Sequence, residues 1–250
     1  MTQSTKKIPL ERALSKMGLA SRTQAAALVK EKKVTVNGLY PRNALALVSL
    51  EKDHIKILGV EPAKVGLRIL LLHKPKKYVT TRSDEQGRPT IFDLVDEPKQ
   101  GLHAVGRLDQ ATTGLLILTN DTKLSAWLTD PKNEIPRAYV VTVRGELTAT
   151  KAQALIGGVQ VLGDHLKAES VEILKASGKE THFKIVLKEG KNREIRKMCE
   201  EVGHEVTRLK RISFGALELG DLELGKTREL TLAELKAKIP NAPVSLTPKS

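Results

Sequence analysis

The sequence predicts an α+β protein in which a mixed, largely antiparallel sheet forms the main domain and a small α/β domain precedes it. Strand-like segments outnumber helical segments, and short helical patterns lie between them. The first 67 residues hold 12 Lys and Arg against 5 Asp and Glu, which is about half of the net charge of +13. The amino-terminal quarter is therefore interpreted as a separate basic module.

The basic module has the pattern of two helices followed by a hairpin. Apolar residues recur at helical spacing over residues 10–17, and Ser21 opens a second helix with a capping-box pattern. Val34–Val36 alternates like a strand and runs into Asn37-Gly38, a strong hairpin signal. Residues 55–57 alternate again and close the module, which we expect to span residues 8–58.

A larger domain is expected over residues 68–238, after a linker at 59–67 that contains proline and glycine. A basic turn is expected at His73–Tyr78, and a flexible tail over residues 239–250. Strand-like patterns cover residues 68–72, 140–143 and 183–187, and helical patterns cover 124–128, 150–156 and 194–202.

Composition favours a partner that is a polyanion. The pI of about 9.7 fits nucleic acid or an anionic membrane. No apolar run approaches the roughly 20 residues that span a bilayer, and the first residues lack a signal-peptide pattern, so we expect a cytoplasmic protein without a membrane partner. Cys199 is the single cysteine, which excludes a disulfide within the chain and argues against a thiolate zinc site; no metal is required.

Asp109 lies in the segment that says most about chemistry. It follows Gly106 and Arg107 and precedes a Thr-Thr-Gly turn that leads into a strand. A carboxylate held on such a loop can act as a nucleophile or a base. The same pattern is typical of a solvated aspartate that pairs with an arginine or caps a turn, and the residues alone favour that interpretation.

Longer motifs resemble known families. Residues 106–121, Gly-Arg-Leu-Asp followed by Thr-x-Gly-Leu-Leu-x-Leu-Thr-Asn-Asp, resemble the catalytic motif of the RsuA/RluB-type ribosomal RNA pseudouridine synthases. Residues 20–38 resemble the S4-type RNA-binding domain, with Thr23 where that family often has a second basic residue. The resemblance extends over roughly residues 8 to 236 and includes further motifs at 73–81, 189–198, 203–217 and 225–230.

The resemblance implies a site with three catalytic side chains. Asp109 matches the essential aspartate, Tyr139 matches the aromatic that stacks on a flipped uracil, and Arg196 matches the basic residue that pairs with the aspartate. Arg137 stands where the family often has lysine, a change that alters geometry while keeping charge. An apolar wall is expected from Leu217 or Leu209. Substrate contacts are expected from Arg107, Thr113, Lys74, Lys191, Arg193 and Leu217, and RNA contacts of the S4-like domain from Arg22, Lys30, Lys32 and Lys33.

The implied activity is isomerisation of a specific uridine in ribosomal RNA. It needs no cofactor, because nothing is added to or removed from the substrate. The expected partner is ribosomal RNA or a subunit assembly intermediate, and a monomer suffices. Residues 88–93 and 189–196 favour the large-subunit 23S RNA over the small-subunit 16S RNA, whereas residues 101–104 resemble the small-subunit type. An RNA-binding assembly factor and a transfer RNA synthase are the alternatives, and whether Asp109 attacks ribose or removes a proton stays open.

Overall fold

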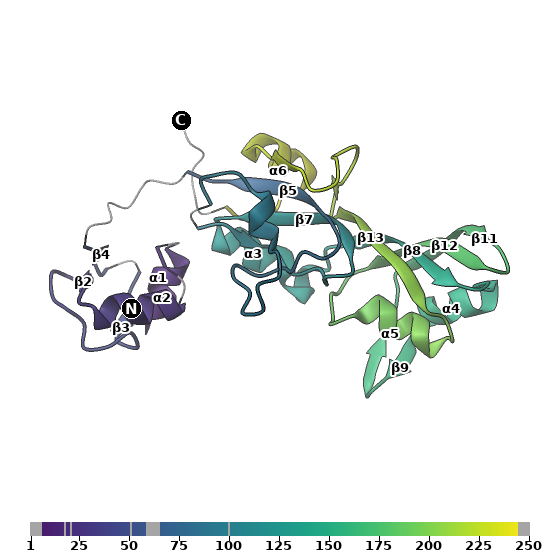
Figure 1. The fold of residues 1–250 in the computed structure, drawn as a ribbon, viewed down its shortest axis with the longest axis horizontal. Helices are drawn as coiled ribbons and strands as arrows, with labels where there is room; N and C mark the ends of the chain where they lie inside the picture. The colour runs from purple at the N-terminus through teal and green to yellow at the C-terminus, as the bar shows by residue number, and fades with distance from the viewer. Residues whose placement is uncertain are drawn as a thin grey trace.

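The computed structural model describes residues 7–17, 19–20, 22–50, 52–58, 66–99 and 101–244. In this part of the chain, two helices and four short strands make up the amino-terminal module, and a large sheet with its helices makes up the rest (Figure 1). The expected α+β class is confirmed. No helix of the described residues is long and apolar enough to cross a membrane.

The amino-terminal module has an apolar core of its own. Leu14, Ala25 and Val34 are completely buried in it. Its elements are β1 (Ile8–Pro9), α1 (Leu10–Lys16), α2 (Arg22–Lys30), β2 (Val34–Val36), β3 (Leu47–Val48) and β4 (Ile55–Ile57). Strand β1 pairs with β3 and strand β2 pairs with β4, and both pairings are antiparallel.

The predicted turn at Asn37-Gly38 is present, but no strand follows it directly. Asn37 and Gly38 have φ angles of 53° and 82°, the conformation that this turn requires. Val36 and Leu39 exchange two backbone hydrogen bonds of 2.8 and 3.0 Å across the turn. Pro41, two residues after Leu39, has no N–H to continue a ladder, and β2 pairs with the later strand β4.

The main domain is built on a nine-stranded sheet. Its strands are β5 (Ile69–Lys74), β6 (His103–Ala104), β7 (Thr113–Thr119), β8 (Arg137–Arg144), β11 (Ser170–Ala176), β12 (Glu180–Leu187), β13 (Val206–Phe214), β14 (Leu217–Glu218) and β15 (Thr227–Glu229). The central path runs β11-β12-β8-β13-β7-β5-β15, with β6 on β7 and β14 on β13. Only the pairing of β13 with β7 is parallel, so the sheet is mixed and largely antiparallel, as predicted.

Apolar cores lie on both faces of the sheet. Side chains alternate along a strand, so Ile69 and Leu71 belong to one core and Leu70 and Leu72 to the other. The first core also holds residues of α3 (Thr122–Thr129) and α6 (Leu232–Lys238). The second holds residues of the 3-10 helix η1 (Ile91–Leu94), α4 (Ala149–Gly157), the hairpin β9 (Val159–Val161) and β10 (Asp164–Leu166), and α5 (Glu194–Glu201). Figure 1 shows α3 and α6 around β5 and β7, and α4 and α5 beside β8 and β12.

Two boundaries differ from those expected. His73 and Lys74 continue strand β5 instead of forming a turn, because the ladder with β7 extends to the pair of Lys74 and Gly114. Ile239 and Ala242, which were expected to belong to a flexible tail, are buried in the first core. Residues 59–65 of the expected linker and residues 245–250 lie outside the described part of the chain.

Candidate active site

Asp109 lies on the loop between β6 and β7. Buried polar side chains donate hydrogen bonds to main-chain oxygens of this loop. The hydroxyl of Thr80 donates to the carbonyl oxygen of Leu108 at 2.7 Å. The ammonium of Lys74 donates to the carbonyl oxygens of Asp109 and Thr112 at 3.1 and 3.0 Å. The main chain of Asp109 is therefore held in place, while its side chain remains 38% exposed.

Lys74, which was expected to contact substrate, serves this loop instead. It is completely buried and is absent from the lining of the pocket described below. Carbonyl oxygens of Pro75, Asp109 and Thr112 accept from its Nζ, which matches the three donors of an ammonium. Burial lowers the pKa of Lys74 to about 8, and the charge of Asp109 acts in the opposite direction. At neutral pH the side chain is therefore charged.

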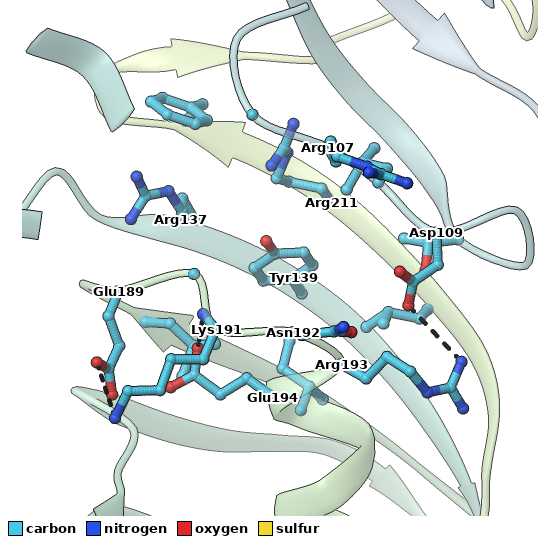
Figure 2. A pocket seen from close by; sticks show the side chains of 18 of the residues that line it. Arg107, Asp109, Arg137, Tyr139, Glu189, Lys191, Asn192, Arg193, Glu194 and Arg211 are labelled. Carbon is cyan, nitrogen blue, oxygen red and sulfur yellow. Dashed lines mark hydrogen bonds and ion pairs between the residues drawn. The ribbon is translucent and has the colours of Figure 1, made fainter. Parts of the chain in front are cut away.

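Asp109 opens onto a pocket of about 600 Å³ on the face of the second core (Figure 2). This volume falls in the range of small-molecule sites. The lining comes from the Asp109 loop, the end of α3 with the following 3-10 helix η2 (Pro131–Asn133), strands β8 and β13, and residues 187–195. The expected site residues that the pocket brings together are Arg107, Asp109, Tyr139, Lys191 and Arg193.

The ion pair of Asp109 is formed with Arg193 and not with Arg196. Arg193 Nη1 lies 3.8 Å from Asp109 Oδ2, and both side chains are partly exposed. Arg196 is half-buried, and its Nη1 donates to the carbonyl oxygen of Val206 at 3.0 Å. Burial and the charge of Arg193 lower the pKa of Arg196, and the charge of Asp109 opposes this shift. Arg196 is therefore within electrostatic reach of Asp109 although the pairing expected from the sequence is not formed.

Tyr139 stands on the pocket wall, and Leu209 supplies the apolar surface next to it. Tyr139 is 8% exposed and comes from β8, and Leu209 comes from the neighbouring strand β13. Leu217 was also expected to form this wall. It is buried in the first core on the other face of the sheet, so this expectation is wrong.

Two buried guanidinium groups, those of Arg137 and Arg211, lie against one phenylalanine in the pocket. The Cζ atom of Arg137 lies 4.8 Å from the centre of the Phe214 ring, and the Cζ atom of Arg211 lies 5.2 Å from it. Arg137 donates from Nη1 to Lys188 O at 3.1 Å and from Nη2 to Leu128 O at 3.2 Å. Burial lowers the pKa of Arg137. Arg137 thus binds main-chain oxygens, and Arg211 lines the pocket beside it.

Glu194 is a buried carboxyl group to which sequence reasoning gave no role. It is 3% exposed, and its Oε2 accepts from the main-chain N–H of Lys191 at 3.0 Å. Burial, and after it the nearby carboxyl group of Glu189, raises the pKa of Glu194 to about 7. Glu189 forms a 3.2 Å ion pair with Lys191 Nζ. The pocket therefore contains a carboxyl group that titrates near neutral pH.

The remaining expected contacts lie away from this pocket. The hydroxyl of Thr113 donates to Leu209 O at 3.4 Å and does not line the pocket. Lys30, Lys32 and Lys33 are exposed at the end of α2 and just after it. Arg22 begins α2, but its side chain lies outside the described part of the structure. Nowhere in the described residues do three or more His, Cys, Asp or Glu side chains gather as metal ligands would.

Three curated relatives match about nine tenths of this chain. A curated relative from Aquifex aeolicus, named an uncharacterized RNA pseudouridine synthase, is 34% identical over 230 residues, which cover 91% of this chain and 92% of the relative. A Bacillus subtilis protein named ribosomal large subunit pseudouridine synthase B is 33% identical over 229 residues, covering 91% and 93%. A protein of the same name from Pseudomonas aeruginosa is 37% identical over 234 residues, covering 90% and 60%.

A solved structure and two family models point the same way. A crystal structure of a pseudouridylate synthase superposes with a TM-score of 0.67 at 27% identity, covering 93% of this chain and all of that one. The S4 domain model matches residues 8–39, and the RNA pseudouridylate synthase model matches residues 68–201. The resemblance found in the sequence is thereby confirmed, and the chain belongs to the RNA pseudouridylate synthase family.

Proposed function

We propose that this protein converts a specific uridine of large-subunit ribosomal RNA into pseudouridine. The names of the relatives from Bacillus subtilis and Pseudomonas aeruginosa support the choice of RNA. The observation that carries the proposal is the position of Asp109, on a loop fixed by Lys74 and Thr80, at the mouth of a pocket walled by Tyr139.

In the proposed reaction, the bond from ribose C1′ to uracil N1 breaks and a bond from C1′ to C5 forms. Substrate and product contain the same atoms, so no cofactor takes part. A uridine in a helix must leave the stack to reach the pocket, which costs on the order of a few kcal/mol. Stacking of the base on Tyr139 offsets part of this cost, on the order of 1–3 kcal/mol.

Asp109 is the proposed catalytic carboxylate at the ribose. It acts either by attack on C1′ or by removal of a ribose proton, and both routes need the carboxylate next to the sugar of the flipped nucleotide. The positive charges of Arg193 and Arg196 both lie within electrostatic reach of this carboxylate. Arg107, Lys191 and Arg193 line the pocket as proposed contacts for the RNA backbone.

The amino-terminal module is the proposed second RNA-binding surface. Its match to the S4 domain and the exposed Lys30, Lys32 and Lys33 support this role. Phosphate contacts from such lysines contribute affinity without base specificity. The proposed domain limits are residues 8–58 and 68–244, the proposed compartment is the cytoplasm, and the proposed working form is a monomer.

The test uses large-subunit RNA, small-subunit RNA and transfer RNA, each carrying tritium at uracil C5. The new bond to C5 displaces its hydrogen, so tritium appears in water as pseudouridine forms. We expect release from the large-subunit RNA alone. Release from small-subunit or transfer RNA would reassign the substrate, and tight binding without release from any RNA would favour an assembly factor.

A further inference from the structure

Arg211 is a buried cation of the pocket, and one of its hydrogen-bond donors, Nη2, has no acceptor among the described residues. The residue is 3% exposed, and its Nε donates to Leu115 O at 2.7 Å. Its guanidinium lies 5.2 Å from the centre of the Phe214 ring. Nη2 is buried, yet no described residue offers it an acceptor.

The position of Arg211 next to Tyr139 is set by the sheet. Arg211 in β13 and Tyr139 in β8 are directly paired, and directly paired residues project from the same face. On the other side of β13, Gly114 has a φ of 110°, and a Cβ there would lie 2.1 Å from Arg211 O. Figure 2 shows Arg211 beside Tyr139 on the pocket wall, between Asp109 and Arg137.

The Nη2 donor without an acceptor distinguishes Arg211 from Arg137, the other buried guanidinium of the pocket. Both Nη atoms of Arg137 donate to main-chain oxygens, so Arg137 has a complete structural role. Leaving a buried charged donor unpaired is costly, and planar guanidinium groups suit fixed acceptors on planar ligands. An acceptor brought in by the ligand would satisfy Nη2.

We propose that Arg211 donates from Nη2 to a carbonyl oxygen of the flipped uracil and stabilises the negative charge that the base gains when its bond to ribose breaks. This inference rests on the proposed function. When C1′–N1 breaks, its electron pair stays on the uracil and is shared by the ring and its two carbonyl oxygens. C5 then forms the bond to C1′, the proton leaves C5, and N1 takes up a proton from water.

Such a contact favours the reaction because it strengthens as the charge develops. A donor fixed in advance and shielded from water stabilises the transition state more than the ground state. Arg211 would therefore affect the rate of bond breaking more than the affinity for RNA. Loss of one donor of this kind lowers kcat by roughly 10²–10³-fold.

The experiment measures single-turnover rates for the wild-type protein and for Arg211→Gln. The substrates are large-subunit RNA fragments with uridine, 2-thiouridine or 4-thiouridine at the target position. Sulfur accepts hydrogen bonds poorly, so the wild-type protein should slow on the one thio-substrate that lacks the contacted oxygen. Arg211→Gln should react about 10²-fold more slowly with uridine and show no further loss on that thio-substrate.

Matched controls separate the outcomes. Arg144→Gln also removes an arginine from the paired strands, but Arg144 is 72% exposed and lies outside the pocket, so its rate should stay near wild type. A wild-type rate in Arg211→Gln would overturn the proposal, and so would equal losses on the thio-substrate in both proteins. If Arg211→Gln does not fold, equal wild-type rates on all three substrates would overturn it. Absence of pseudouridine from wild-type protein on uridine would instead reject the proposed function.

Discussion

Arg193 forms the ion pair with Asp109, at 3.8 Å, from the N-cap position that precedes α5, where its φ is 53°. Arg196, one turn further along, keeps a donor to Val206 O and has a buried Nε without an acceptor among the described residues. Arg193 and Arg196 are therefore both candidates for the basic partner of Asp109, and they differ in the burial of their side chains.

Substitution of each of the two arginines should lower the single-turnover rate by a different factor. An exposed pair such as that of Arg193 contributes about 0.2–1 kcal/mol, so Arg193→Gln should slow single turnover by at most about fivefold. Arg196→Gln removes a half-buried cation near the carboxylate, and we expect a loss of more than about tenfold. Single-turnover rates at saturating enzyme decide the point. A larger loss in Arg193→Gln than in Arg196→Gln would make Arg193 the essential partner.

Lys74 predicts a loss of rate without a loss of RNA affinity. Lys74→Met removes three hydrogen bonds, two of which hold the loop of Asp109, and a shift of about 1 Å in a catalytic group costs about 10²-fold in rate. Since Lys74 does not line the pocket, the Kd for RNA should stay within a few-fold of wild type. Lys76→Met, in the exposed turn nearby, is the control. A Kd that rises together with the loss of rate would mean that Lys74 touches substrate.

Glu194 predicts stability that falls as pH rises. Its pKa is raised from 4.5 to about 7 in the folded protein, chiefly by burial. Between these values the native state binds more protons than the unfolded chain, so unfolding becomes easier with increasing pH. Glu194→Gln is neutral at every pH and should gain Tm relative to wild type from about pH 5 to about pH 8, by roughly 2–4 °C per kcal/mol.

Thermal melts at several pH values measure this difference. Glu200→Gln, in the same helix but exposed, is the control and should show no such trend. A constant difference in Tm between Glu194→Gln and wild type at all pH values would contradict the raised pKa of Glu194.

The exposed lysines after α2 predict a salt effect. Each phosphate contact on duplex RNA or DNA adds about 0.9 to the slope of log K against log salt, by analogy with B-DNA. Replacing Lys30, Lys32 and Lys33 with Gln should therefore lower the slope by up to roughly 2–3. The same change at the exposed Lys175 and Lys179 of the main domain controls for lost charge. An unchanged slope in the triple variant would place the RNA elsewhere.

Local patterns predicted the elements of this fold better than the packing around the site. The alternation over residues 183–187 and the helical spacing of 194–202 correspond to β12 and α5. Helix α6 was missed even though Thr231 and Glu234 have the capping-box spacing and form that box in the structure. Asp109 and Tyr139 came from the motif resemblance and both line the pocket.

Residues that depend on distant partners were not predictable in the same way. Lys74 is buried because carbonyl oxygens 35 and 38 residues away accept from it, which no local pattern reveals. The resemblance offered both Leu209 and Leu217 for the apolar wall. Leu209 lies on β13 before the register shift between Arg211 and Ser213, whereas Leu217 follows that shift, on β14. A bulge moves the side chains after it to the other face, so the motif did not reveal that Leu217 packs in the first core.

Asp109→Asn tests the central claim most directly. The substitution keeps the shape of the side chain and removes its charge, and the loop is held through main-chain atoms that the substitution does not touch. Tritium release from large-subunit RNA labelled at uracil C5 should disappear in this variant, while RNA binding and Tm stay close to wild type. Normal release by Asp109→Asn would contradict the assignment of Asp109 as the catalytic carboxylate.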